Sequence, residues 1–111
     1  MTTIVILKDS RQQYRGFLCM GHADYSRRKS QPDILCASIS VLVINTINSL
    51  EELAHEKLDY TVNEDTGFIK CDFEGQLQEK SVFLLDAMVF GLNTLSSTYG
   101  RKYLQVNFEE V

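Results

Sequence analysis

The sequence predicts an α+β fold, a two-layer sandwich in which two long helices pack on one face of a mixed β-sheet. Short β-branched or alternating stretches flank two long segments with helical spacing, in the order ββαββαβ. The length of 111 residues fits one domain, residues 1–111, with a modest core. Hydrophobic residues make up 44% of the chain and charged residues 23%, which is ordinary for a soluble globular protein.

The first two strands are expected at residues 3–7 and 14–20, paired as a hairpin. Residues 3–7 are β-branched and apolar, whereas residues 8–13 are polar and turn the chain. Gly21 ends the second strand.

A loop at residues 23–33 and a long helix are expected next. The loop carries a short basic run and the only proline, Pro32, which favours an extended conformation at the residue before it. Asp33 is a good N-cap for a helix that runs to about residue 55. That helix is apolar on more than one side, so it needs either thorough coverage or a partner subunit. Its apolar face is formed by Ile39, Leu42, Ile47, Leu50 and Leu53, and is widened by Val41, Val43 and Ile44.

The second half of the chain repeats the pattern. Strands at residues 58–63 and 68–73 flank Glu64-Asp65-Thr66-Gly67, which has the composition of a hairpin turn. A second helix follows at residues 77–99, and Gly100 suits its C-terminal end. Residues 103–108 alternate as a last strand.

Composition narrows the class of protein. A net charge of −4 argues against direct nucleic-acid binding. Three cysteines without a C-x-x-C pair argue against a disulfide framework or a zinc site, and fit a reduced cytoplasm. The N-terminus lacks the pattern of a secretion signal. The longest apolar stretch, residues 34–44, is too short to span a membrane.

Two residues that flank the 23–33 loop suggest nucleophilic chemistry. Cys36 falls in the first turn of the predicted helix, where free amides and the positive end of the helix dipole stabilise a thiolate and hold an oxyanion. His22 can take the thiol proton and return it to a leaving amine, and Gly21 before it permits close approach. Each residue also has a structural explanation: a cysteine that fills the core, and a histidine exposed at a strand end.

Two supporting residues have open roles. Asp33 either caps the helix, accepting a hydrogen bond from an amide such as that of Cys36, or orients His22 as a third catalytic residue. Ser40, one turn beyond Cys36, either supports the site or bonds a backbone carbonyl. Cys19 and Cys71 are expected to be core thiols.

These segments resemble a known family. Gly21-His22-Ala23-Asp24 and Asp33-Ile34-Leu35-Cys36-Ala37, in this order, are similar to the ribosomal-processing cysteine protease family Prp. The resemblance implies a cysteine endopeptidase without metal or organic cofactor that removes the N-terminal extension of a large-subunit ribosomal protein of the bL27 type. Cys36 would be the nucleophile, His22 the general base and acid, and Asp33 and Ser40 supporting residues. It also implies a homodimer, which would cover the first helix.

The loop departs from the family pattern, because Arg27-Arg28-Lys29-Ser30-Gln31-Pro32 stands where the family often has a shorter segment with a glycine. Two other functions compete with a protease: a non-catalytic ribosome-associated binding module on the same fold, and a redox-sensing protein that uses Cys36 alone. Dependence on His22 separates the protease from the redox sensor.

Overall fold

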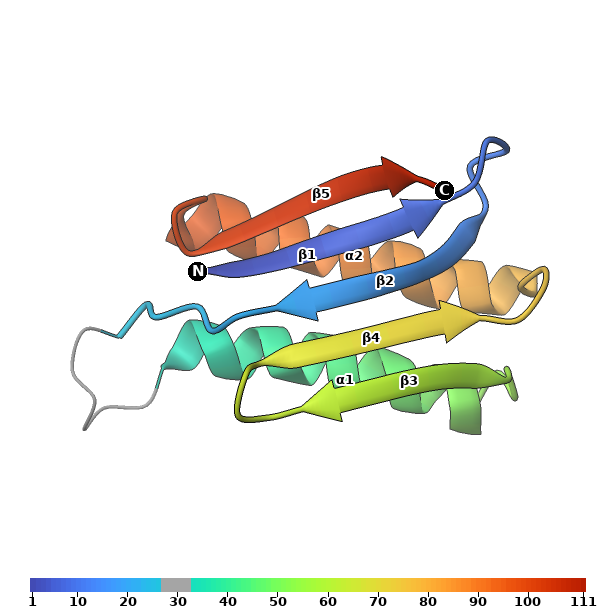
Figure 1. Cartoon of the computed structure of the whole chain (residues 1–111), viewed down its shortest axis with the longest axis horizontal. Helices are drawn as coiled ribbons and strands as arrows, with labels where there is room; N and C mark the ends of the chain where they lie inside the picture. Colours follow the sequence, from blue (N-terminus) through green and yellow to red (C-terminus); the bar gives the residue numbers. More distant parts are fainter. Residues whose placement is uncertain (27–32) are drawn as a thin grey trace.

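The computed structural model describes residues 1–26 and 33–111, so the predicted loop segment Arg27-Arg28-Lys29-Ser30-Gln31-Pro32 lies outside the described residues. The observed order of elements, ββαββαβ, confirms the prediction (Figure 1). The elements are β1 (Thr2–Lys8), β2 (Tyr14–Met20), α1 (Ile34–Glu52), β3 (Leu58–Asn63), β4 (Phe68–Phe73), α2 (Glu79–Tyr99) and β5 (Leu104–Glu110).

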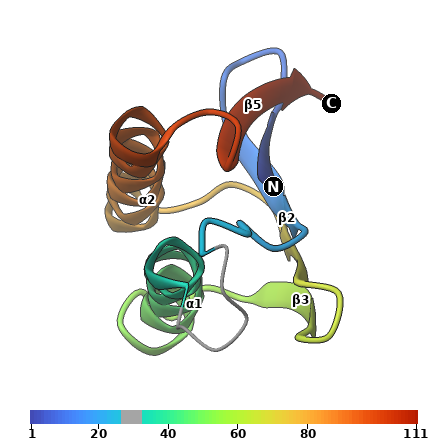
Figure 2. The same ribbon diagram turned by 90° about the vertical axis from the view of Figure 1, so that its left-hand side faces the viewer.

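The five strands form one mixed sheet in the order β3-β4-β2-β1-β5. β1 pairs antiparallel with β2 as the expected hairpin and parallel with β5, which the chain reaches through α2. Figure 2 shows both helices on the same side of this sheet. The two-layer architecture predicted from the sequence is therefore confirmed.

The core lies between the helices and the sheet. It is formed by Ile4, Ile6 and Phe17 from the strands, by Leu35, Ile39, Val43, Ile47 and Leu50 from α1, and by Leu85, Met88 and Leu92 from α2.

The prediction that α1 runs to residue 55 with Leu53 on its apolar face is wrong. The helix ends at Glu52, and Leu53 is its C-cap with a side chain that is 70% exposed. His55 then adopts a left-handed conformation with φ 55°, which turns the chain toward β3. α2 begins at Glu79 rather than residue 77, and Gly100 caps its end with φ 114° as expected.

Both helices are long and apolar enough, by length and composition alone, to cross a membrane. Residues 34–44 alone are shorter than a membrane span, but α1 continues to Glu52. A third of the apolar window of each helix is buried inside the protein, where it packs on the sheet. A core helix of a globular protein shows the same packing.

Three chain segments meet at one end of the sheet and define the candidate site. They are the C-terminal end of β2, the N-terminal end of α1 and the turn between β3 and β4 (Figure 1). His22, Cys36 and the turn residues Glu64-Asp65-Thr66-Gly67 belong to these segments.

Candidate active site

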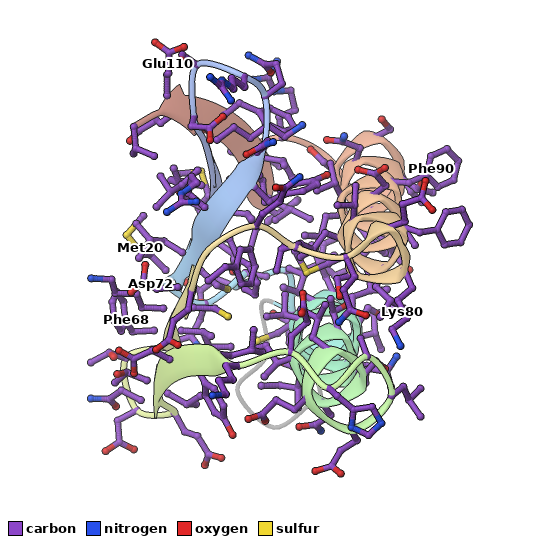
Figure 3. The ribbon with its side chains drawn as sticks, turned by 90° about the vertical axis from the view of Figure 1, so that its right-hand side faces the viewer. Met20, Phe68, Asp72, Lys80, Phe90 and Glu110 are labelled. Atoms are coloured by element: carbon purple, nitrogen blue, oxygen red, sulfur yellow. The ribbon has the colours of Figure 1, made fainter. Side chains whose placement is uncertain are left out.

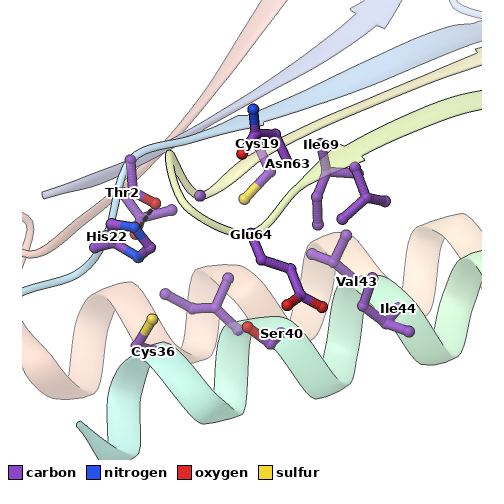
Figure 4. A pocket seen from close by; sticks show the side chains of 14 residues that line it. Thr2, Cys19, His22, Cys36, Ser40, Val43, Ile44, Asn63, Glu64 and Ile69 are labelled. Carbon is purple, nitrogen blue, oxygen red and sulfur yellow. Dashed lines mark hydrogen bonds between the residues drawn. The ribbon is translucent and has the colours of Figure 1, made fainter.

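A pocket of about 240 Å³ opens where these three segments meet. His22 and Cys36 both line it, as do Gly21 and Ser40, so the structure brings four of the five predicted site residues to one cavity (Figure 4). The other lining residues are Thr2, Cys19, Ile39, Val43, Ile44, Val62, Asn63, Glu64, Gly67 and Ile69.

His22 is exposed and is held by the turn between β3 and β4. Its Nε2 lies 3.1 Å from the carbonyl oxygen of Asp65. A carbonyl oxygen only accepts hydrogen bonds, so Nε2 is the protonated nitrogen in this arrangement. Nδ1 of the neutral ring is then the nitrogen free to accept a proton.

Two glycines allow the turn to approach His22. Gly67 has φ +67°, and a β-carbon there would collide with the Gly21 carbonyl oxygen and lie 3.1 Å from Cε1 of His22. Gly21 has φ +86°, and a β-carbon there would lie 2.5 Å from the carbonyl oxygen of Met1. Side chains at either position would push the backbone away from the histidine.

Cys36 is half-buried in the first turn of α1, on the wall of the pocket that faces His22. Figure 4 shows its sulfur directed toward the imidazole. No hydrogen bond joins the two side chains in the described part of the chain. Catalytic hydrogen bonds are often long before substrate binds, so this separation is compatible with a thiol–imidazole pair.

Asp33 caps α1 with one carboxylate oxygen and binds the chain that follows His22 with the other. Oδ1 accepts a hydrogen bond of 3.0 Å from the amide of Cys36, and Oδ2 accepts bonds of 2.7 Å and 3.3 Å from the amides of Tyr25 and Ser26. Desolvation by burial raises the pKa of Asp33, but the amide hydrogen bonds outweigh it and hold the pKa below its ordinary value. Of the two roles left open, the structure shows the cap, and Asp33 also ties the start of α1 to the chain that follows His22.

The amides that the sequence suggested as oxyanion donors already donate hydrogen bonds to Asp33. The amide of Cys36 donates to Asp33 Oδ1, and the amide of Ala37 donates to the Asp33 carbonyl oxygen at 3.0 Å. Both helix-start amides nearest the thiol are therefore engaged in this structure. The sequence indicated the Cys36 amide both as an oxyanion donor and as a partner of the cap, and the structure shows the bond to the cap.

Cys19 and Cys71 are buried, as the sequence predicts. Burial raises the pKa of Cys19 to about 11, with a smaller contribution from the nearby Cys36. Burial likewise raises the pKa of Cys71 to about 12, with smaller contributions from Asp72, Glu51 and Asp59. Both groups stay protonated near neutral pH, so neither is a competing nucleophile.

Sequence reasoning missed the part played by the β3–β4 turn. Asp65 through its carbonyl, Gly67 through its missing side chain, and Glu64 as a lining residue all belong to the site. The turn signal was visible, but nothing in it indicated that the turn meets His22, which lies over forty residues earlier. Within residues 1–26 and 33–111, no group of three or more His, Cys, Asp or Glu side chains could hold a metal ion.

A thiol at a helix start and an imidazole held by a third group, on facing walls of one pocket, form the arrangement of a cysteine-type peptidase. The family described as cysteine protease Prp matches residues 1–104. The chain therefore belongs to the cysteine protease Prp family, and it is a cysteine-type peptidase of a family of ribosomal processing enzymes.

Similar proteins agree with this assignment. The ribosomal processing cysteine protease Prp of Bacillus subtilis is 25% identical over 87 residues, which cover 75% of this chain and 76% of that protein. The Prp protease of S. aureus, solved with a covalently linked product peptide, has the same fold, with a TM-score of 0.89 at 21% identity over 98% of this chain and 100% of that chain. SMU.848 from Streptococcus mutans superposes with a TM-score of 0.84 at 23% identity over 100% of this chain and 96% of that chain.

Proposed function

We propose that this protein is an endopeptidase that removes the N-terminal extension of a large-subunit ribosomal protein of the bL27 type during ribosome maturation. The observation that carries the proposal is the pocket in which Cys36 faces an imidazole whose Nε2 is held by Asp65. Membership of a ribosomal processing family supports the substrate class. The S. aureus protease was solved with a substrate peptide and with a covalently linked product peptide, which supports a peptide as the ligand here.

The proposed mechanism assigns a role to each side chain. Nδ1 of His22 takes the proton of the Cys36 thiol, and the thiolate attacks the scissile carbonyl. The imidazolium then gives its proton to the leaving amine, so the ribosomal protein departs with a new N-terminus and the extension stays on Cys36 as a thioester. Water, deprotonated by His22, hydrolyses the thioester and restores the thiol. The Asp65 carbonyl keeps the same nitrogen of His22 available in both halves of the cycle.

Asp33 and Ser40 support the site without entering these steps. Asp33 fixes the helix start that carries Cys36. Ser40 lies one turn further along α1 and presents its hydroxyl to the pocket, where it can bond the substrate backbone. The Cys36 amide can donate a hydrogen bond to an oxyanion only when its bond to Asp33 breaks.

We also propose that two copies of this chain associate through the outer surface of the helices. A groove between α1 and α2 is lined by apolar side chains that include Val41, Leu42, Phe90 and Leu95. Phe90 is 77% exposed and Val41 is 67% exposed, and Figure 3 shows Phe90 projecting away from the sheet. An exposed apolar surface of this kind is characteristic of an interface. We further propose that the protein acts in the cytoplasm, where it binds neither membranes nor nucleic acid and needs no cofactor.

The test is cleavage of the N-terminally extended ribosomal protein encoded in the same genome, followed by mass spectrometry of the products. We expect the wild-type protein to release the intact extension at a single bond. Cys36→Ala should abolish release and His22→Ala should slow it greatly, whereas Cys71→Ala, which removes a buried thiol outside the pocket, should retain it. Absence of cleavage by the wild-type protein would contradict the proposal.

A further inference from the structure

Glu64 lies in the turn between β3 and β4 and lines the pocket that contains Cys36. Figure 4 shows its carboxylate directed away from the turn and into the pocket, above Ser40. Its neighbour in the chain, Asp65, supplies the carbonyl that holds His22. One turn therefore positions the proposed base and presents a carboxylate to whatever binds beside the thiol.

The turn that carries Glu64 is held by its own hydrogen bonds. Oδ1 of Asn63 accepts bonds from the amides of Asp65 and Thr66, at 3.1 Å and 3.4 Å. The carbonyl of Glu64 accepts a bond from the amide of Gly67 at 3.4 Å. The backbone at Glu64 is thus fixed before a ligand arrives, which lowers the entropy cost of using its side chain for recognition.

Among residues 1–26 and 33–111, no cationic side chain forms an ion pair with the Glu64 carboxylate. The ion pairs found among the described residues join Met1 to Asp24 and Lys70 to Asp72, and neither includes Glu64. The pocket that it enters also has an apolar lining, formed by Ile39, Val43, Ile44, Val62 and Ile69. A group with an aliphatic stem and a cationic end suits both features, because the stem covers apolar surface while the cation meets the carboxylate.

We propose that Glu64 is a specificity-determining residue that binds a cationic group of the peptide substrate close to the scissile bond. The cation is a lysine or arginine side chain or a free amino terminus. This inference rests on the proposed peptidase function for its substrate, but the charge of the pocket can be measured without any peptide.

The first experiment measures the charge preference of the pocket through Cys36. The rate of Cys36 modification is compared for a cationic and an anionic methanethiosulfonate of similar size, with the modified cysteine located by mass spectrometry. Glu64→Gln should lower the ratio of cationic to anionic rates about threefold, the size of effect expected from one exposed charge at short range. Glu74→Gln removes an exposed carboxylate outside the pocket and should leave the ratio unchanged. An unchanged ratio in Glu64→Gln would overturn the proposal.

The second experiment reverses the charges on peptides that span the cleavage site. Lysine, arginine, glutamine and glutamate are placed at each position around the scissile bond, and one further peptide pair carries a free or an acetylated amino terminus. Glu64→Lys should favour glutamate at the one position, or the acetylated terminus, where the wild-type protein favours the cation. If charge reversal changes all peptides equally, Glu64 does not contact the substrate and the proposal fails. If the wild-type protein cleaves no peptide, the proposed peptidase function fails. The ratio of cationic to anionic modification rates at Cys36 then still tests whether Glu64 attracts a cation.

Discussion

Nε2 of His22 lies 3.1 Å from the carbonyl oxygen of Asp65, so the histidine at the end of β2 is held by the turn between β3 and β4. The sequence left open that the carboxylate of Asp33 orients His22, but both of its oxygens accept bonds from backbone amides. A backbone carbonyl carries no charge that could be lost on titration. The orientation of His22 therefore depends on the shape of the turn, which substitutions can test.

Gly67→Ala should reduce catalysis by displacing His22. The new β-carbon would collide with the Gly21 carbonyl and crowd the imidazole. We expect kcat/KM to fall by about tenfold or more, since misplacement of a reacting group near 1 Å can cost up to about a hundredfold. Steady-state kinetics on a peptide substrate measures this effect.

Gly75→Ala is the matched control for Gly67→Ala. Gly75 also has a positive φ, +71°, but beyond its own residue and its two chain neighbours nothing lies within 4 Å of the added β-carbon. Each variant should lose about 1–2 kcal/mol of stability from the left-handed conformation. Gly67→Ala should lose more because of its collision with Gly21, and only Gly67→Ala should lose catalytic activity. Equal activity of the two variants would show that the turn does not position His22.

Asp33→Ala should destabilise the protein by about 1–2 kcal/mol through loss of the N-cap of α1. The amide bonds hold the pKa of Asp33 below its usual 3.8 in the folded state, so its contribution is present above that pH and is lost as the pH falls through the folded pKa. Urea unfolding between pH 7 and pH 3 should show a steeper loss in the wild-type protein than in Asp33→Asn. Parallel curves would exclude this contribution.

Tyr14 joins β2 to α2 through a hydrogen bond of 2.5 Å from its hydroxyl to Asp86. Burial, followed by the bond to Asp86 and its charge, raises the pKa of Tyr14 above the usual 10.0. Tyr14→Phe should cost roughly 1.5–3 kcal/mol, as expected for a hydrogen bond to a charged group. The contribution of this bond to the free energy of unfolding is fully present below the ordinary pKa of 10.0 and is lost as the pH rises toward the raised pKa of the folded state. The difference between Tyr14→Phe and wild type in urea unfolding should therefore shrink above pH 10.

Tyr60→Phe is the control for Tyr14→Phe, because the hydroxyl of Tyr60 also meets a carboxylate, that of Glu51, but at an exposed edge. We expect its effect to stay within about 0.5 kcal/mol, as for most surface substitutions. Equal losses in the two variants would show that burial of the Tyr14 bond contributes nothing.

Phe90→Ser should weaken self-association if the helix face joins two copies. Phe90 is 77% exposed in the groove between α1 and α2, whereas Phe108 is 54% exposed on the edge strand β5. Sedimentation analysis should show a concentration-dependent dimer for the wild-type protein and for Phe108→Ser, and a monomer for Phe90→Ser. A monomeric wild-type protein at all concentrations would contradict the proposed interface.

The parts of this structure that local patterns determine were predictable. Alternation placed the strands, helical spacing placed the core of α1 and α2, and Pro32-Asp33 marked the start of α1 and its cap. The contact between Asp65 and His22 was not predictable, because it depends on how β4 pairs with β2 and brings the β3–β4 turn beside Gly21. The end of α1 before residue 55 was also not predictable, because the left-handed conformation that follows it falls on His55 and not on a glycine, and no proline marks it.

In the proposed mechanism, the Cys36 thiolate forms a covalent bond to the substrate with His22 as its base. Rapid-quench mass spectrometry of the intact protein with the extended ribosomal protein measures this bond directly. We expect a transient species heavier than the enzyme by the extension peptide less one water, with the added mass on Cys36. Cys36→Ala should not form it, and His22→Ala should form it at a greatly reduced rate. Cleavage without this species, or the added mass on Cys19 or Cys71, would contradict Cys36 as the nucleophile.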